Sequence, residues 1–94
     1  MPPKLLSEEE IAKRLTEISQ WTRTGNEIQR KIKFKNFLES MGFVNKVAVL
    51  SEGMDHHPDI LIQWNRVSLT LSTHSAGGLT DMDFVLARRI DGSL

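Results

Sequence analysis

The stretch VSLTLS, residues 67–72, decides the fold, because apolar and hydroxyl side chains alternate along it. This period of two is typical of a β-strand with one buried face and one polar face. The preceding run DILIQW, residues 59–64, also predicts a strand, with its isoleucines and Trp64 on one face. Asn65-Arg66 separates the two runs, so we expect a β-hairpin with its turn at these two residues.

A second hairpin is predicted upstream of the first. Residues 21–24 and 27–34 are rich in strand-forming side chains, and Gly25-Asn26 between them favours a two-residue turn. The apolar residues of the longer run fall on one face, although Arg30 shares that face and makes the alternation imperfect.

Three helices are predicted around the hairpins. The pattern SEEE, residues 7–10, is typical of a capping box and begins a helix over residues 8–19. Asn36 caps a second helix, which we expect to end near Gly53 as its C-terminal glycine. Thr80 caps a third helix that runs close to the end of the chain.

The second helix has the strongest amphipathic pattern in the sequence. Phe37, Met41, Val44 and Ala48 recur at helical spacing, with Val47 alongside. We therefore expect this stripe to face the core.

The predicted element order is α-β-β-α-β-β-α. This order favours an α+β fold: one four-stranded antiparallel sheet with three helices on one face. The 94 residues fit a single domain over residues 1–94. Residues 1–6, which begin with two prolines, are expected to form a loose N-terminal arm.

The composition excludes several classes of protein. The chain has no cysteine, which excludes disulfides, thiolate zinc sites and cysteine nucleophiles. Twelve Lys and Arg balance twelve Asp and Glu, so no net field draws the protein to nucleic acid or an anionic membrane. No apolar run reaches the roughly 20 residues of a membrane span, and no signal-peptide pattern is present. We expect a cytoplasmic protein that binds neither nucleic acid nor membrane.

Groups that titrate near neutral pH concentrate in EGMDHHP, residues 52–58. This stretch holds His56 and His57, two of the three histidines, and His74 follows the last predicted strand. Imidazole has an unperturbed pKa of about 6.5, so it gives or takes a proton at neutral pH. Such groups suit the removal of water from a carbon that also bears nitrogen, which needs one acid and one base.

Other readings of these residues stay open. Three histidines can bind zinc, but His56 and His57 are neighbours that point to opposite sides of an extended segment, so we expect no metal. The histidine pair is equally consistent with loop packing. Asp83 fits the N3 position of the third helix whatever the function. Core or strand-end positions suit the remaining candidates, which are Trp21, Ser72 and Thr73.

The spacing of these residues resembles the pattern of the pterin-4a-carbinolamine dehydratases. The pattern consists of Glu52, His56-His57-Pro58, Trp64, His74 and Asp83. The resemblance covers most of the chain. It also includes Trp21, the region from Phe34 to Phe37, Val47-Ala48 and the run LTLSTH at residues 69–74.

The resemblance implies a reaction and a set of roles. Members dehydrate 4a-hydroxytetrahydrobiopterin, which aromatic amino acid hydroxylases release, to the quinonoid dihydropterin; the pterin is the substrate and no further cofactor is expected. His56 and His74 are implied as the acid–base pair, and His57 as a group that orients the pterin. Asp83 is implied beside the site, supporting a histidine or the helix start. The residues implied to line the pterin pocket are Glu52, Asp55, Ser72 and Thr73, with Trp21 and Pro58 as apolar walls.

The resemblance also implies a homodimer or homotetramer, formed through sheet edges and the second helix. Two departures from the family pattern stand out: Ile60-Leu61 replaces an aromatic residue found in animal members, and Met82 replaces a frequent arginine. Neither departure removes an acid or a base. The alternative function is a non-enzymatic dimerisation or binding module that uses the second helix, which contains Gly42, and a sheet edge.

Overall fold

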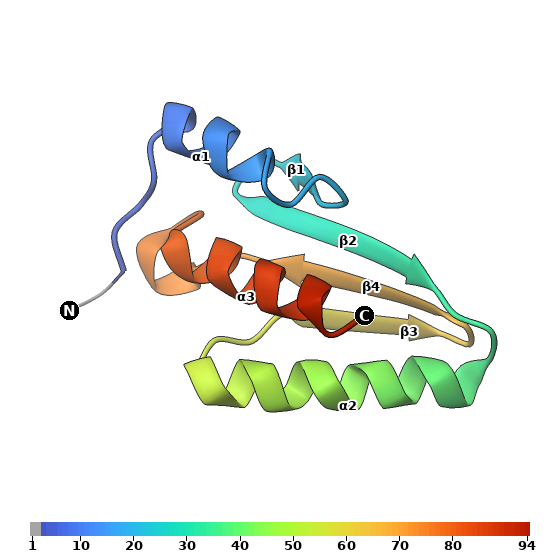
Figure 1. The fold of residues 1–94 in the computed structure, drawn as a ribbon. Helices are drawn as coiled ribbons and strands as arrows, with labels where there is room; N and C mark the ends of the chain where they lie inside the picture. The colour runs from blue at the N-terminus through green and yellow to red at the C-terminus, as the bar shows by residue number, and fades with distance from the viewer. Residues whose placement is uncertain (1–2) are drawn as a thin grey trace.

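The computed structural model describes residues 3–94 as a four-stranded antiparallel sheet with three α-helices on one face (Figure 1). The order α-β-β-α-β-β-α confirms the predicted fold class. The elements are α1 (Glu8–Leu15), β1 (Thr22–Thr24), β2 (Glu27–Lys33), α2 (Phe37–Met54), β3 (Asp59–Gln63), β4 (Arg66–Leu71), the short 3-10 helix η1 (His74–Ala76) and α3 (Asp81–Gly92).

Strand β4 lies between β2 and β3, because the strand order is β1-β2-β4-β3. The predicted alternation explains this interior place: Val67, Leu69 and Leu71 are buried under the helices, while Ser68 and Thr70 lie on the open face. Both neighbours of β4 are antiparallel to it. The pattern that decides the fold therefore belongs to the strand that joins the two hairpins into one sheet.

The turn of the second hairpin lies one residue earlier than predicted. Gln63 pairs with Arg66, so Trp64 and Asn65 form the turn, and Trp64 adopts a φ of 53°. Asn65 forms two hydrogen bonds with Phe34, the residue that follows β2. The Asn65 carbonyl accepts from the Phe34 N–H at 2.7 Å, and the Asn65 side-chain amide donates to the Phe34 carbonyl at 3.2 Å. This tertiary contact sets the register, and it leaves Trp64 exposed rather than on the core face.

Helix α1 ends at Leu15, before the predicted end at Ser19. The N–H groups of Thr16, Glu17 and Ile18 bond to carbonyls three residues back, so the chain tightens into turns after the helix. Ile18 is still buried, as the apolar spacing predicts.

Helix α2 occupies the predicted place, but only part of the predicted stripe faces the core: Val47 is buried and Val44 packs against the core. Its buried residues are Ser40, Phe43, Val47 and Ser51, whereas Phe37 and Ala48 of the predicted stripe are exposed. Counting apolar residues missed part of this face because two small serines belong to it. Neither α2 nor any other helix within residues 3–94 is long and apolar enough to cross a membrane.

The described part of the N-terminal arm is bonded to the body, which corrects the expectation of a loose segment. Leu5 forms an isolated bridge with Thr80, and the Leu6 N–H donates to the Leu79 carbonyl at 3.0 Å. A Cβ atom at Gly78 would lie 3.0 Å from the Leu5 side chain, so the glycine makes room for this contact. Met1 and Pro2 lie outside the described residues.

Candidate active site

An open hollow of about 240 Å³ lies where the connector after α2 meets the loop after β4. All three histidines of the chain line it. Its full lining is Asp55, His56, His57, Asp59, Ser72, Thr73, His74 and Ser75. Two segments that are far apart in the sequence thus bring the predicted titratable groups to one place.

The end of α2 positions His56. The His56 N–H donates to the Ser51 carbonyl at 3.1 Å and the Asp55 N–H to the Glu52 carbonyl at 3.2 Å, which is the pattern of a Schellman motif. Asp55 takes the left-handed conformation of this motif, with φ 49° and ψ 44°. The helix ends near Gly53 as predicted, but the left-handed residue after it is Asp55 rather than Gly53, because Met54 packs against the core and extends the helix past the glycine.

A tightly bonded loop positions His74. The Thr73 N–H donates to the Gly78 carbonyl at 3.0 Å, and the Thr73 carbonyl accepts from the N–H groups of Ala76 and Gly77, each at 3.0 Å. Gly77 has a φ of 79°, a conformation that favours glycine and closes the turn. The loop therefore carries His74 on a fixed 3-10 turn at the edge of the hollow.

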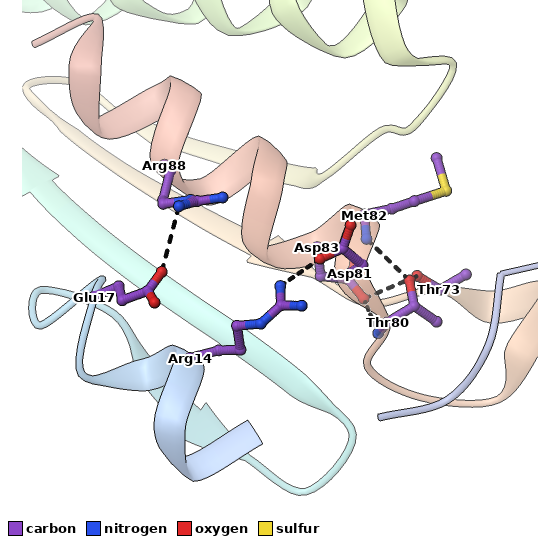
Figure 2. Close-up of polar contacts among 8 residues, drawn as sticks. All are labelled: Arg14, Glu17, Thr73, Thr80, Asp81, Met82, Asp83 and Arg88. Atoms are coloured by element: carbon purple, nitrogen blue, oxygen red, sulfur yellow. Dashed lines mark hydrogen bonds and ion pairs between the residues drawn. The ribbon is translucent and has the colours of Figure 1, made fainter. Parts of the chain in front are cut away.

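A buried carboxylate lies behind His56. Asp83, with 0% exposure, bonds His56 from Oδ1 at 2.6 Å. Its Oδ2 accepts from the Thr73 hydroxyl at 2.8 Å and from the Thr80 N–H at 3.0 Å. Figure 2 shows Thr73, Thr80 and Asp83 gathered at the start of α3. Asp83 therefore has both predicted roles: Oδ2 caps the start of α3, and Oδ1 binds His56.

His57 has a different environment from its neighbour. Its Nε2 lies 2.5 Å from Glu52 Oε2, and both side chains are largely exposed. The extended connector points the two histidines to different partners, as expected for adjacent residues. His57 is therefore held only by an exposed contact, whereas His56 is held by a buried carboxylate.

The structure places three predicted pocket residues away from the lining: Glu52, Trp21 and Pro58. Glu52 reaches the site only through its contact with His57. Trp21 is buried in the core, and its indole N–H donates to Asp91 Oδ1 at 2.8 Å. Pro58 is half-buried in the connector and is absent from the lining. Asp59 and Ser75 line the hollow without having been predicted; each directly follows a predicted site segment, which is the only signal in the sequence.

The side chains of the hollow do not converge as metal ligands. Within residues 3–94, no group of three or more histidine, aspartate or glutamate side chains is arranged to hold a metal ion. The hollow offers groups suited to proton transfer: His56 held by a buried carboxylate, the exposed side chains of His57 and His74, and carboxylates in the lining.

The fold and the hollow define a class: small α+β proteins with histidines gathered between a helix end and a strand end. The chain belongs to the pterin 4 alpha carbinolamine dehydratase family, whose model matches residues 4–93.

Relatives from distant organisms support this membership. A protein of Sulfolobus acidocaldarius is 50% identical over 86 residues, which cover 92% of this chain and 94% of that protein. One from Nocardia farcinica is 50% identical over 91 residues, covering 97% of this chain and 96% of the relative. Both carry pterin-4-alpha-carbinolamine dehydratase as a provisional name.

Solved structures agree with the fold. A transcriptional coactivator/pterin dehydratase from Brucella melitensis superposes with a TM-score of 0.89 at 36% identity, covering 93% of this chain and 95% of that one. A pterin dehydratase-like RuBisCO assembly factor of the alpha-carboxysome superposes with a TM-score of 0.62 at 22% identity, covering 77% and 83%. The second similarity concerns the fold alone.

Proposed function

We propose that the protein dehydrates 4a-hydroxytetrahydrobiopterin, a pterin-4a-carbinolamine, to the quinonoid dihydropterin by histidine acid–base catalysis. The observation that carries this proposal is the convergence of His56, His57 and His74 on one hollow, with His56 held by a buried carboxylate. Family membership supplies the substrate class.

The reaction needs two proton transfers at one substrate. The C4a–OH bond breaks and its hydroxyl leaves as water after it receives a proton, while a ring N–H loses its proton as the C=N bond forms. His56 and His74 line the hollow from two separate segments, so they can serve the two transfers. His57 and the polar residues Asp55 and Ser72 orient the pterin, and Glu52 acts through His57. Thr73 also lines the hollow, but its hydroxyl proton is directed to Asp83. No cofactor or metal takes part in this proposal, and the product re-enters the pterin cycle of aromatic amino acid hydroxylases.

Dehydration kinetics test this proposal. The decay of 4a-hydroxytetrahydropterin, followed by ultraviolet absorbance, should be faster with the wild type than with buffer. His56→Ala and His74→Ala should each lower kcat by about 10²–10⁴-fold, the usual worth of a positioned acid or base. Lys46→Ala, on exposed α2 surface outside the hollow, is the control and should match the wild type. A wild type no faster than buffer would overturn the proposal.

We also propose that the chain forms a homo-oligomer through α2 and the β3 edge. Leu38 and Val49, eleven residues apart on one side of α2, are 80% and 73% exposed. Strand β3 is a sheet edge with Ile60 and Leu61 exposed, and such an edge is a template for a further strand. These same surfaces suit the alternative function, a binding module for another protein.

Light scattering of the purified protein tests the oligomer. A dimer or tetramer is expected, and Leu38→Glu with Val49→Glu should lower the mass, whereas Lys13→Glu on α1 should not. A monomeric wild type that still dehydrates pterin would contradict the oligomer but leave the enzyme. A protein with no dehydratase activity that retains a stable partner would favour the binding module.

A further inference from the structure

We infer that Thr80 and Thr73 form a one-way hydroxyl relay that sets the tautomer of His56 through Asp83, leaving Nδ1 as the proton-exchanging atom. The catalytic meaning of this relay rests on the proposed function. Both threonines are positioning residues, since they act through Asp83 rather than on the substrate.

The direction of the relay follows from counting protons. A carboxylate only accepts, so the single proton of the Thr73 hydroxyl goes to Asp83 Oδ2, 2.8 Å away. The bond between Thr73 Oγ1 and Thr80 Oγ1, also 2.8 Å, must then use the Thr80 proton. Thr80 Oγ1 in turn accepts from the Met82 N–H at 3.3 Å (Figure 2). Each donor therefore points toward Asp83.

The relay determines where the proton between Asp83 and His56 lies. Both partners of Asp83 Oδ2 donate to it, so a carboxyl proton would have to sit on Oδ1, facing His56 Nε2 at 2.6 Å. An ionised Asp83 accepts at both of its oxygens, so His56 Nε2 is the donor in this bond. The shared proton therefore lies on Nε2, and neutral His56 carries its lone pair on Nδ1.

The free nitrogen can be reached from the hollow. Within residues 3–94, Ser51 Oγ is the one buried side-chain polar atom without a partner. His56 Nδ1 has no protein hydrogen bond in this part of the chain, so it is not sealed off but accessible. His56 lines the hollow, and the relay behind it is buried, with Thr73 at 3% and Thr80 at 0% exposure.

Nitrogen NMR of the histidine rings tests the inference without any substrate. At a pH where His56 is neutral, the wild type should show a protonated Nε2 and an unprotonated Nδ1. Thr73→Val keeps the side-chain shape but removes the donor, so it should shift His56 toward a mixture of tautomers. Thr73→Ser and Thr80→Ser keep the hydroxyls and should restore the wild-type spectrum. Thr80→Val, which interrupts the relay one step further away, should shift the mixture less.

Kinetics provide the second readout. Thr73→Val should lower kcat by more than about tenfold and leave KM almost unchanged. The drop in kcat should be smaller than the roughly 10⁴-fold loss seen when a hydrolase triad holds its histidine wholly in the wrong tautomer. Thr70→Val on the open face of β4 removes a hydroxyl that bonds Gln29, and this control should change neither tautomer nor kcat.

Each outcome decides the inference. A wild-type His56 protonated on Nδ1 would overturn it, and so would a folded Thr73→Val with the wild-type tautomer. If no variant, including the wild type, dehydrates pterin, the proposed function fails, while the NMR result still decides the relay.

Discussion

At the scale of single residues, the candidate site depends on backbone positions more than on the histidines themselves. His56 is fixed by its own N–H at the end of α2 and by Asp83 at its ring. Asp55, between the helix and His56, adopts a left-handed conformation that most side chains avoid. Asp55 also lines the hollow, so its side chain can contact a bound ligand while its backbone ends the helix.

Substitution of Asp55 separates the effect of its backbone conformation on stability from the effect of its side chain on the reaction. Asp55→Gly should leave the free energy of unfolding unchanged or raise it by up to about 1 kcal/mol, because glycine adopts this conformation freely. Asp55→Val should lower it by about 1–2 kcal/mol. Urea titrations of both variants check this. A dehydration rate that falls in Asp55→Gly despite full stability would show that the carboxylate contacts the pterin; an equal loss of stability in both variants would contradict the account.

The sequence predicts the members of the site better than their geometry. The spacing of His56, His57 and His74 pointed to one site, and the structure gathers them. Trp21 was wrongly grouped with them, because an aromatic side chain matches a pocket wall as well as a core position, and only packing distinguishes the two. No local pattern could show that Asp83, an ordinary helix-start residue, reaches His56 at 2.6 Å from 27 positions away.

At the scale of elements, α2 shows why apolar periodicity alone identified only part of the buried face. Two of its four buried residues are serines, and both are almost fully buried at 0% and 2% exposure. Ser40 Oγ donates to the Asn36 carbonyl at 3.1 Å, whereas Ser51 Oγ has no partner within the described chain. The small serine side chains on this face let α2 pack closely against its neighbours. A search for apolar residues at helical spacing does not include serines, so it misses this part of the face.

The two serines give a matched pair of variants. Ser40→Ala and Ser51→Ala gain the same helix propensity, so their difference reports the hydroxyl environment. Ser51→Ala removes an unpaired buried group and should be more stable than Ser40→Ala by about 1–2 kcal/mol. Thermal unfolding of the two proteins side by side gives this difference. Equal stabilities, or a more stable Ser40→Ala, would show that Ser51 has a partner the account lacks.

At the scale of the whole molecule, Asp91 connects three parts of the chain. From the end of α3 it accepts from the Trp21 indole and forms an ion pair with Arg30 of β2. This contact explains why a cation interrupts the apolar face of β2, which the sequence showed only as an imperfect alternation. Arg14 and Asp81 form another ion pair, between α1 and α3, at a more exposed position (Figure 2).

The two ion pairs should differ in their contribution to stability. Asp91→Ala leaves an indole N–H and a largely buried guanidinium without an acceptor, and should lower the free energy of unfolding by about 1.5–3 kcal/mol. Asp81→Ala breaks an exposed pair and should cost less than about 1 kcal/mol. Denaturant unfolding of both variants measures the contrast. Similar losses would mean that Asp91 does not hold the molecule together.

The central claim is that His56 and His74, from two separate segments that line one hollow, act on one substrate. The most direct measurement is kcat of His56→Ala, His74→Ala and the double variant on the 4a-carbinolamine. Residues that act as a unit are strongly non-additive, so the double variant should be no slower than the slower single variant. A double variant whose loss equals the product of the two single losses, or single variants as fast as the wild type, would contradict the claim.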